Sequence, residues 1–164
     1  MAKDSFFIRK TVNIGNTATF QEEAIDMGAY VDALSSSIVR IHNVAASFSD
    51  ATGTSNIVTG PAAAQFQLTT QSQADTVLPS DRSVVASGRI NVDGAGGVAS
   101  YVSQDFDVLP QMWTNGYLIG VESLYLGGEA SAGFAGNVYV TIVLECTVEK
   151  MSQSAAMALA LSQQ

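Results

Sequence analysis

The chain has 164 residues, of which 47% are apolar and only 13% are charged, and its formal net charge is −8. This length fits one domain with a sizeable core, and the composition argues against a disordered chain. Because the basic residues are scattered, the chain has no cationic stripe for binding nucleic acid or an anionic membrane surface. The seven basic residues are Lys3, Arg9, Lys10, Arg40, Arg82, Arg89 and Lys150.

The N-terminal stretch MAKDSFFIRKTVNIG lacks the apolar run of a signal peptide, and no stretch approaches the roughly 18 to 20 apolar residues of a membrane span. We therefore expect synthesis in the cytoplasm without an export signal. The single cysteine, Cys146, leaves no pair for an internal disulfide. The low charge indicates a surface rich in neutral residues, which costs little to desolvate against neighbouring subunits.

Short β-branched and aromatic runs, separated by Gly, Ser and Thr clusters, predict eight strands in chain order. Their ranges are 5–14, 17–25, 36–48, 62–70, 82–92, 98–109, 116–126 and 137–150. In the first strand, Phe6, Ile8, Val12 and Ile14 share one face, and Gly15–Asn16 forms a turn after it. This period of two is typical of half-buried antiparallel strands.

Two segments favour helical structure. Residues 22–34, EEAIDMGAYVDAL, fit a helical turn inside a long connection between strands. The last residues, MSQSAAMALALSQQ, are rich in Ala, Leu and Met, and they predict a short helix capped by Ser152. Such a short helix needs a partner surface, and we expect it to pack on its own domain. The chain thus divides into a sandwich domain, 1–150, and a tail, 151–164.

Many short strands with little helix predict an all-β fold. Eight strands at this length fit an antiparallel jelly-roll sandwich with a short C-terminal helix or tail. An immunoglobulin-like sandwich would need fewer residues, and the cysteine pair of antibody domains is absent. No internal repeat is visible, which argues against a solenoid or a propeller.

Cys146 and His42 are the first candidates for chemistry. In strand 137–150, the period of two places Cys146 on the apolar face and Glu145 and Glu149 on the other. A buried thiol behaves as a small hydrophobe, so the sequence argues against a nucleophile. His42 is the only histidine and shares a strand face with Ile38 and Arg40, which favours a structural role over a catalytic or metal-binding one.

Two loop-like segments are weaker candidates for ligand binding. Glu22, Glu23 and Asp26, with Asp32 beyond, form the densest group of carboxylates, but their spacing matches no calcium loop. We expect a solvated loop there and leave calcium binding open. The run DGAGG, 93–97, lacks the lysine and the spacing of a phosphate loop, so we expect a strand connection.

Exposed aromatic residues would mark a carbohydrate site, because sugar rings stack on them. Trp113 lies beside the Asn115–Gly116 turn, and Tyr117 and Tyr101 are its candidate companions. A place at the edge of the core or in a subunit contact explains Trp113 equally well. The sequence therefore predicts no catalytic, cofactor-binding or metal-binding residues and no enzymatic activity.

The chain resembles the single jelly-roll capsid proteins of tailless icosahedral viruses, in particular those of membrane-containing viruses of archaea and bacteria. The resemblance lies in the leader MAKDSFFIRKTVNIG, the strand SSIVRIHNV and the closing strand NVYVTIVLECTVEK before a tail. It covers most of the chain as a pattern of strands and composition. The basic N-terminal arm of many small RNA-virus capsid proteins is missing.

The resemblance implies a structural virion protein, a capsid subunit that self-assembles into an icosahedral shell with copies of itself and other capsid proteins. No direct nucleic-acid contact and no small-molecule substrate or cofactor are expected, and contact of the tail with an internal membrane is left open. The alternative is a carbohydrate- or ligand-binding β-sandwich module of a fibre or spike. A hydrolase or isomerase on a barrel is disfavoured by the lone histidine and the apolar setting of Cys146.

Overall fold

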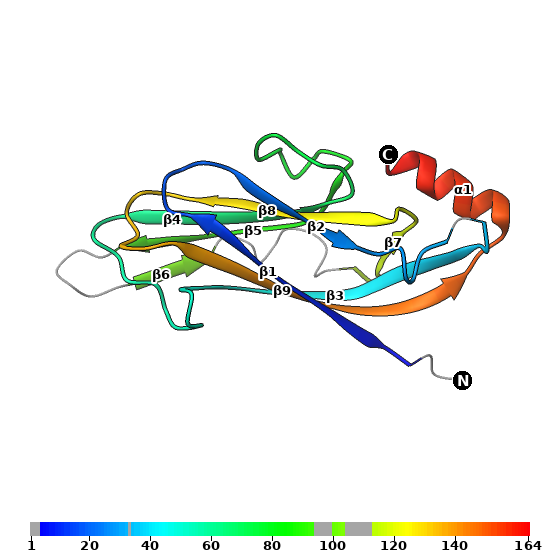
Figure 1. The fold of residues 1–164 in the computed structure, drawn as a ribbon, viewed down its shortest axis with the longest axis horizontal. Helices are drawn as coiled ribbons and strands as arrows, with labels where there is room; N and C mark the ends of the chain where they lie inside the picture. The colour runs from blue at the N-terminus through cyan, green and yellow to red at the C-terminus, as the bar shows by residue number, and fades with distance from the viewer. Residues whose placement is uncertain (1–3, 33, 94–99, 104–112) are drawn as a thin grey trace.

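The computed structural model describes residues 4–32, 34–93, 100–103 and 113–164. In this part of the chain, nine strands form two stacked antiparallel sheets, with one helix at an end of the sandwich (Figure 1). The elements are β1 (Phe6–Gly15), β2 (Gln21–Asp26), β3 (Ser37–Ser49), β4 (Ala62–Thr69), β5 (Val84–Asp93), β6 (Ser100–Ser103), β7 (Tyr117–Ile119), β8 (Ser123–Ala130), β9 (Val138–Lys150) and α1 (Gln153–Ser162).

The strand order confirms the predicted jelly roll. One sheet has the order β1-β9-β3-β7, and the other has the order β2-β8-β4-β5-β6. Without β6, these orders are the two four-stranded sheets of an eight-stranded jelly roll, in which early and late strands of the chain pair with one another. The short β6 pairs with the end of β5 and extends the second sheet by one strand.

The core lies between the sheets and follows the predicted alternation most clearly on β9. Its side chains from Val138 to Cys146 alternate between fully buried and half-buried. The neighbouring β1 confirms the same pattern, with Val12 and Ile14 buried and Phe6 and Ile8 packed against the core. These side chains meet those of β4 and β8, where Phe66, Leu68 and Leu126 are buried.

The predicted strand 116–126 is wrong as a single element, because it contains two strands that belong to opposite sheets. β7 pairs with β3, and β8 pairs with β2 and β4. The chain turns at Gly120, whose N–H donates to the Gln163 side-chain oxygen at 2.8 Å. A Cβ at Gly120 would lie only 3.0 Å from Leu159 of α1, so a glycine lets the helix approach this corner.

A β-bulge interrupts β3 at His42. The pairing with β9 shifts between Ile41 and Asn43, so β3 carries one extra residue there. As a result, Val39 and Ile41 point into the core before the bulge and Val44 points into it afterwards. A simple period of two along the sequence does not reveal this change of face.

On β4, the predicted apolar face is confirmed, but two residues of the polar face are buried as well. Gln67 is 1% exposed and Thr69 is 0% exposed. The connection 70–83 covers them: Val77 N–H donates to Gln67 Oε1 at 2.9 Å, and Gln67 Nε2 donates to the Asp75 carbonyl at 3.4 Å. In Figure 1 this connection lies over the sheet of β4 and β8, on the side away from β9.

The C-terminal helix forms as predicted and packs on its own domain. Ser152 is its N-cap, and its hydroxyl accepts from the Ala155 N–H at 3.3 Å. Ala156 is buried, and Gln163 Nε2 donates to the Leu118 carbonyl at 2.7 Å. The turn predicted within 22–34 occurs at residues 27–31, where the N–H of Val31 donates to the Met27 carbonyl; the residues before it belong to β2.

Gly128 provides a test of the sheet packing. A Cβ at this position would lie 2.3 Å from the Gln65 carbonyl and 3.1 Å from Ile14 Cγ2. We expect Gly128→Ala to lower the free energy of unfolding by about 1–3 kcal/mol in urea titrations, because the site is overpacked. The matched control Gly136→Ala, where a Cβ meets nothing within 4 Å, should change it by less than about 0.5 kcal/mol. Equal effects of the two substitutions would contradict this packing.

Asp50 organises the turn after β3. Its carboxylate accepts from the N–H and hydroxyl groups of both Thr52 and Thr54, and the hydroxyl bonds lower its pKa most. Because the pKa is lower in the folded chain, the stabilisation is present above the unfolded value of about 3.9 and is lost as the pH falls below it. We expect Asp50→Asn to lower the Tm at pH 7 and the difference from wild type to shrink toward pH 3. A pH-independent difference would be incompatible with this linkage.

Candidate functional site

Cys146 and His42 lie on opposite faces of the β1-β9-β3-β7 sheet. Cys146 is fully buried in the core, as predicted. His42 is exposed, and its Nε2 is 2.9 Å from the Thr147 hydroxyl on the outer face. Burial, and secondarily the negative charge of Glu145, raises the pKa of Cys146 to about 12. The thiol therefore stays protonated at neutral pH and has no contact with His42.

The outer surface around His42 holds a polar cluster. Arg40 forms a two-pronged ion pair with Glu149, with nitrogen–oxygen distances of 2.9 and 3.0 Å, and also donates to the Asn115 carbonyl. The hydrogen bonds to Glu149 raise the pKa of the Arg40 guanidinium. These groups satisfy one another and fix β7 beside β3, which is a structural role for the cluster.

The carboxylates of the predicted acidic group have separate partners. Glu22 and Glu23 lie on β2 instead of in a loop and point to opposite faces of the sheet. Glu22 accepts from Ser72 and from the Gln73 N–H, whereas Glu23 forms an ion pair of 2.6 Å with Lys10. Within the described residues, no three His, Cys, Asp or Glu side chains gather as a set that could hold a metal ion.

Asp26 and Asp32 stabilise local turns. Asp26 Oδ1 accepts from the Gly28 N–H, and Asp32 Oδ1 accepts from the Leu34 N–H, each at 2.8 Å. Hydrogen bonds, of which that with the Ser35 side chain is the largest contribution, lower the pKa of Asp32. These bonds account for the two aspartates without a bound cation.

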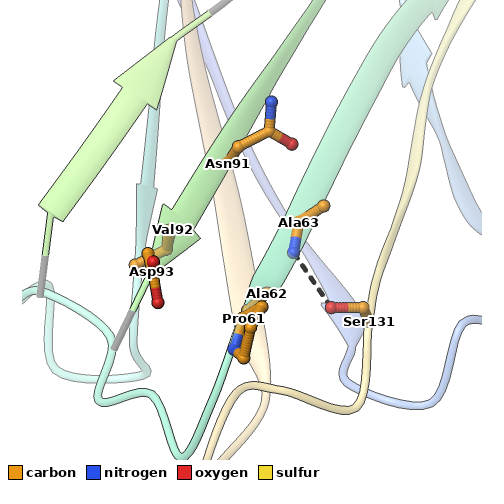
Figure 2. A pocket seen from close by; sticks show the side chains of 7 residues that line it. All are labelled: Pro61, Ala62, Ala63, Asn91, Val92, Asp93 and Ser131. Atoms are coloured by element: carbon orange, nitrogen blue, oxygen red, sulfur yellow. Dashed lines mark hydrogen bonds between the residues drawn. The ribbon is translucent and has the colours of Figure 1, made fainter. Parts of the chain in front are cut away.

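A hollow of about 440 Å³ opens at the end of the sandwich where β5 ends and β4 begins (Figure 2). Its polar groups come from Asn91, Asp93 and Ser131, and the Ser131 hydroxyl accepts from the Ala63 N–H at 2.9 Å. The DGAGG run begins with Asp93, the last residue of β5, which lines this hollow. Its residues 94–97 lie outside the described part of the chain.

Two of the three predicted aromatic residues, Trp113 and Tyr117, do not form an exposed stacking platform. Trp113 and Tyr117 are half-buried, lie 5.2 Å apart between ring centroids, and pack against the core. Burial raises the pKa of Tyr117. Of Tyr101 the structure describes only the backbone, in β6. Trp113 therefore lies at the edge of the core.

The outer faces of the two sheets differ in how the chain covers them. On the β2-β8-β4 side, the connection 70–83 is fastened to the sheet through the side chains of Gln65, Gln67 and Glu22. Sequence reasoning missed this cover, because a loop rich in Ser, Thr and Gln gives no sign of where it lies. The Gln and Thr side chains of this loop are the only sign in the sequence that it packs on the sheet, because buried amide groups need hydrogen-bond partners.

Away from the polar cluster, the outer face of β1, β9 and β3 keeps its side chains at least partly exposed. We call the outward residues of the stretches 7–13, 43–49 and 139–145 the open face; Arg40, His42, Thr147 and Glu149 lie beyond it on the same side of the sheet. They are Phe7, Arg9, Thr11, Asn13, Asn43, Ala45, Ser47, Ser49, Tyr139, Thr141, Val143 and Glu145. Arg9 and Glu145 are its only charges, although soluble surfaces commonly carry charge on about a quarter to a third of their residues.

The state of Cys146 is directly testable. A thiol with a pKa near 12, buried in the core, should react with a disulfide reagent at pH 8 at least about 100-fold more slowly in the folded chain than in guanidinium chloride. The unfolded chain is the control, because its thiol has an ordinary pKa. Rapid labelling of the folded protein would contradict this burial and make Cys146 a candidate nucleophile again.

No helix of the described residues is long and apolar enough to cross a membrane.

No protein-family model and no curated protein matches the chain. Among solved structures, the chain is similar to Merkel cell polyomavirus VP1 in an unassembled pentamer, at 8% identity and a TM-score of 0.43, over 92% of this chain and 98% of that one. It is also similar to a chain of Desmodium yellow mottle tymovirus, at 7% identity and a TM-score of 0.31, over 93% of both chains.

Proposed function

We propose that the chain is a structural virion protein, a capsid subunit that self-assembles into an icosahedral shell through neutral polar and apolar sandwich surfaces. The observation that carries the proposal is the open face. The connection 70–83 covers part of one outer sheet face, whereas no described segment covers the open face, where only two of the twelve residues are charged. A surface of this kind costs little to desolvate, so it suits contact with other subunits.

The remaining features fit a structural role. Cys146 is buried in the core, Arg40 and Glu149 pair with each other, and the carboxylates of 22–32 hold turns and strands together. The polar groups that could carry chemistry are thus engaged in the fold. A shell subunit needs this rigidity, and its partners in our proposal are copies of itself and other capsid proteins of the virion.

The tail, 151–164, gives the proposal a second, independent observation. Met157 and Leu161 of α1 are 48% and 70% exposed, although the helix carries no charged residue. An apolar helix surface of this kind suits contact with a neighbouring subunit, and contact with an internal membrane is a further part of the proposal. The division into a sandwich domain, 1–150, and this tail belongs to it as well.

A ligand-binding module of a fibre or spike is the second candidate, and the hollow at Asn91, Asp93 and Ser131 favours it. None of the described residues that line it is aromatic, so they offer a sugar only amide, carboxylate and hydroxyl groups and no ring on which to stack. This makes the hollow a weaker basis for a function than the open face.

Electron microscopy and light scattering of the purified chain test the proposal. We expect concentration-dependent association into large regular particles, alone or with other capsid proteins. A monodisperse monomer or dimer that is retained on a polysaccharide column would support the binding module instead. Catalytic turnover that is lost in His42→Ala would overturn both in favour of an enzyme.

A further inference from the structure

We propose that the open face packs against the open face of a second copy, so that Arg9 of each copy meets the partner's Glu145. This inference rests on the proposed function and names one of the contacts through which subunits associate.

Neither charge of the open face has an ion-pair partner among the described residues. The ion pairs among the described residues are Lys10–Glu23 and Arg40–Glu149. Arg9 lies over the Phe7 ring, 5.5 Å from its centroid, and Phe7 stands opposite Glu145 in the β1–β9 ladder. The positive and negative side chains are therefore diagonal neighbours on adjacent strands, about 7–8 Å apart at their Cα atoms.

This arrangement is self-complementary under two-fold symmetry. Consider an axis in the plane of the interface, perpendicular to the line from Arg9 to Glu145 and passing through its midpoint. Rotation about this axis places Arg9 of one copy over the partner's Glu145, and the reverse contact forms at the same time. Two opposite charges on one face thus give two intermolecular ion pairs, as an isologous contact requires.

Part of the remaining open face is inexpensive to desolvate. The hydroxyls of Thr11 and Thr141 bond each other across the strands at 2.8 Å, and the Asn13 side chain accepts from the Gly15 N–H. These polar groups keep partners when water is removed, so burying them leaves few unmet hydrogen bonds. Neighbouring Val143 and Ala45 add apolar contact in the same rows.

The other outer face is a poorer match for a second copy. It also carries an arginine and a glutamate, Arg89 and Glu129, but Glu129 already accepts from Gln65 Nε2 at 2.7 Å. Part of that face is covered by the connection 70–83. The open face has neither an internal partner for its charges nor a covering segment among the described residues.

The size of the face sets the expected strength of the contact. Three strands about 4.8 Å apart and about seven residues long give a patch of roughly 24 by 14 Å. This is less than the roughly 800 Å² per partner of a standard stable interface. The isolated pair should therefore be weak, with a Kd of about 10 µM to 1 mM, and gain strength only where several contacts act together in a shell.

Charge reversal tests the pairing by sedimentation velocity over protein concentrations spanning that range. We expect Arg9→Glu and Glu145→Arg each to weaken self-association at least about tenfold, because each brings like charges together twice. The double variant should return to within about threefold of wild type. An equimolar mixture of the two single variants should associate more strongly than either alone.

Arg89→Glu is the matched control, since it makes the same change on the other outer face and should leave the dimer unchanged. All five variants and mixtures are compared at the same ionic strength, with circular dichroism to confirm folding. Failure of the double variant to recover, or an equal effect of Arg89→Glu, would overturn the pairing in favour of another contact. If the pairing fails this test but regular particles still form, the capsid proposal stands. If the wild-type chain stays monomeric and forms no particles, both the pairing and the capsid proposal are wrong.

Discussion

The fold depends on the apolar contact that the inner face of β9 makes between the two sheets. β9 is a central strand of its sheet, paired along most of its length with both β1 and β3. Its buried residues Val140, Ile142 and Leu144 have no exposed surface. At about 25 cal/mol per Å² of apolar area, this row stabilises the sandwich more than any polar contact on its surface. Because every second residue must point inward, the same row also fixes which side chains of β9 reach the outside, and the open face follows from it.

The architecture was predictable where periodicity is strong and local. The alternation along 5–14 and 137–150 predicted both strands and their inner faces, and Ser152 marked the start of α1. Prediction failed where tertiary contacts decide. The corner at Gly120 depends on Gln163, which is 43 residues away, and the bulge at His42 depends on the pairing with β9. The sequence of one strand alone does not show which distant residues will contact it.

The surface features, too, were predictable where they depend on local periodicity and unpredictable where they depend on distant contacts. The placement of Cys146 away from Glu145 was predictable, because it needs only a period of two. The exposure of the open face was not predictable, because it requires the connection 70–83 to lie on the other sheet. The hydrogen bonds of Gln67 and Glu22 hold the connection there. The acidic group around Glu22 looked like one feature in the sequence, yet the strand sends Glu22 and Glu23 to opposite faces with different partners.

The Lys10–Glu23 ion pair has a consequence for how copies of the chain meet. β1 and β2 are the edge strands of their sheets, and the pair lies between them, with Lys10 on the inward side of β1. An inward-pointing lysine on an edge strand hinders a further strand from joining the ladder, because that strand would have to bury the charge. Lys10 therefore disfavours strand-to-strand polymerisation through β1. In the assembly proposed above, copies of the chain would meet through their faces rather than through their edges.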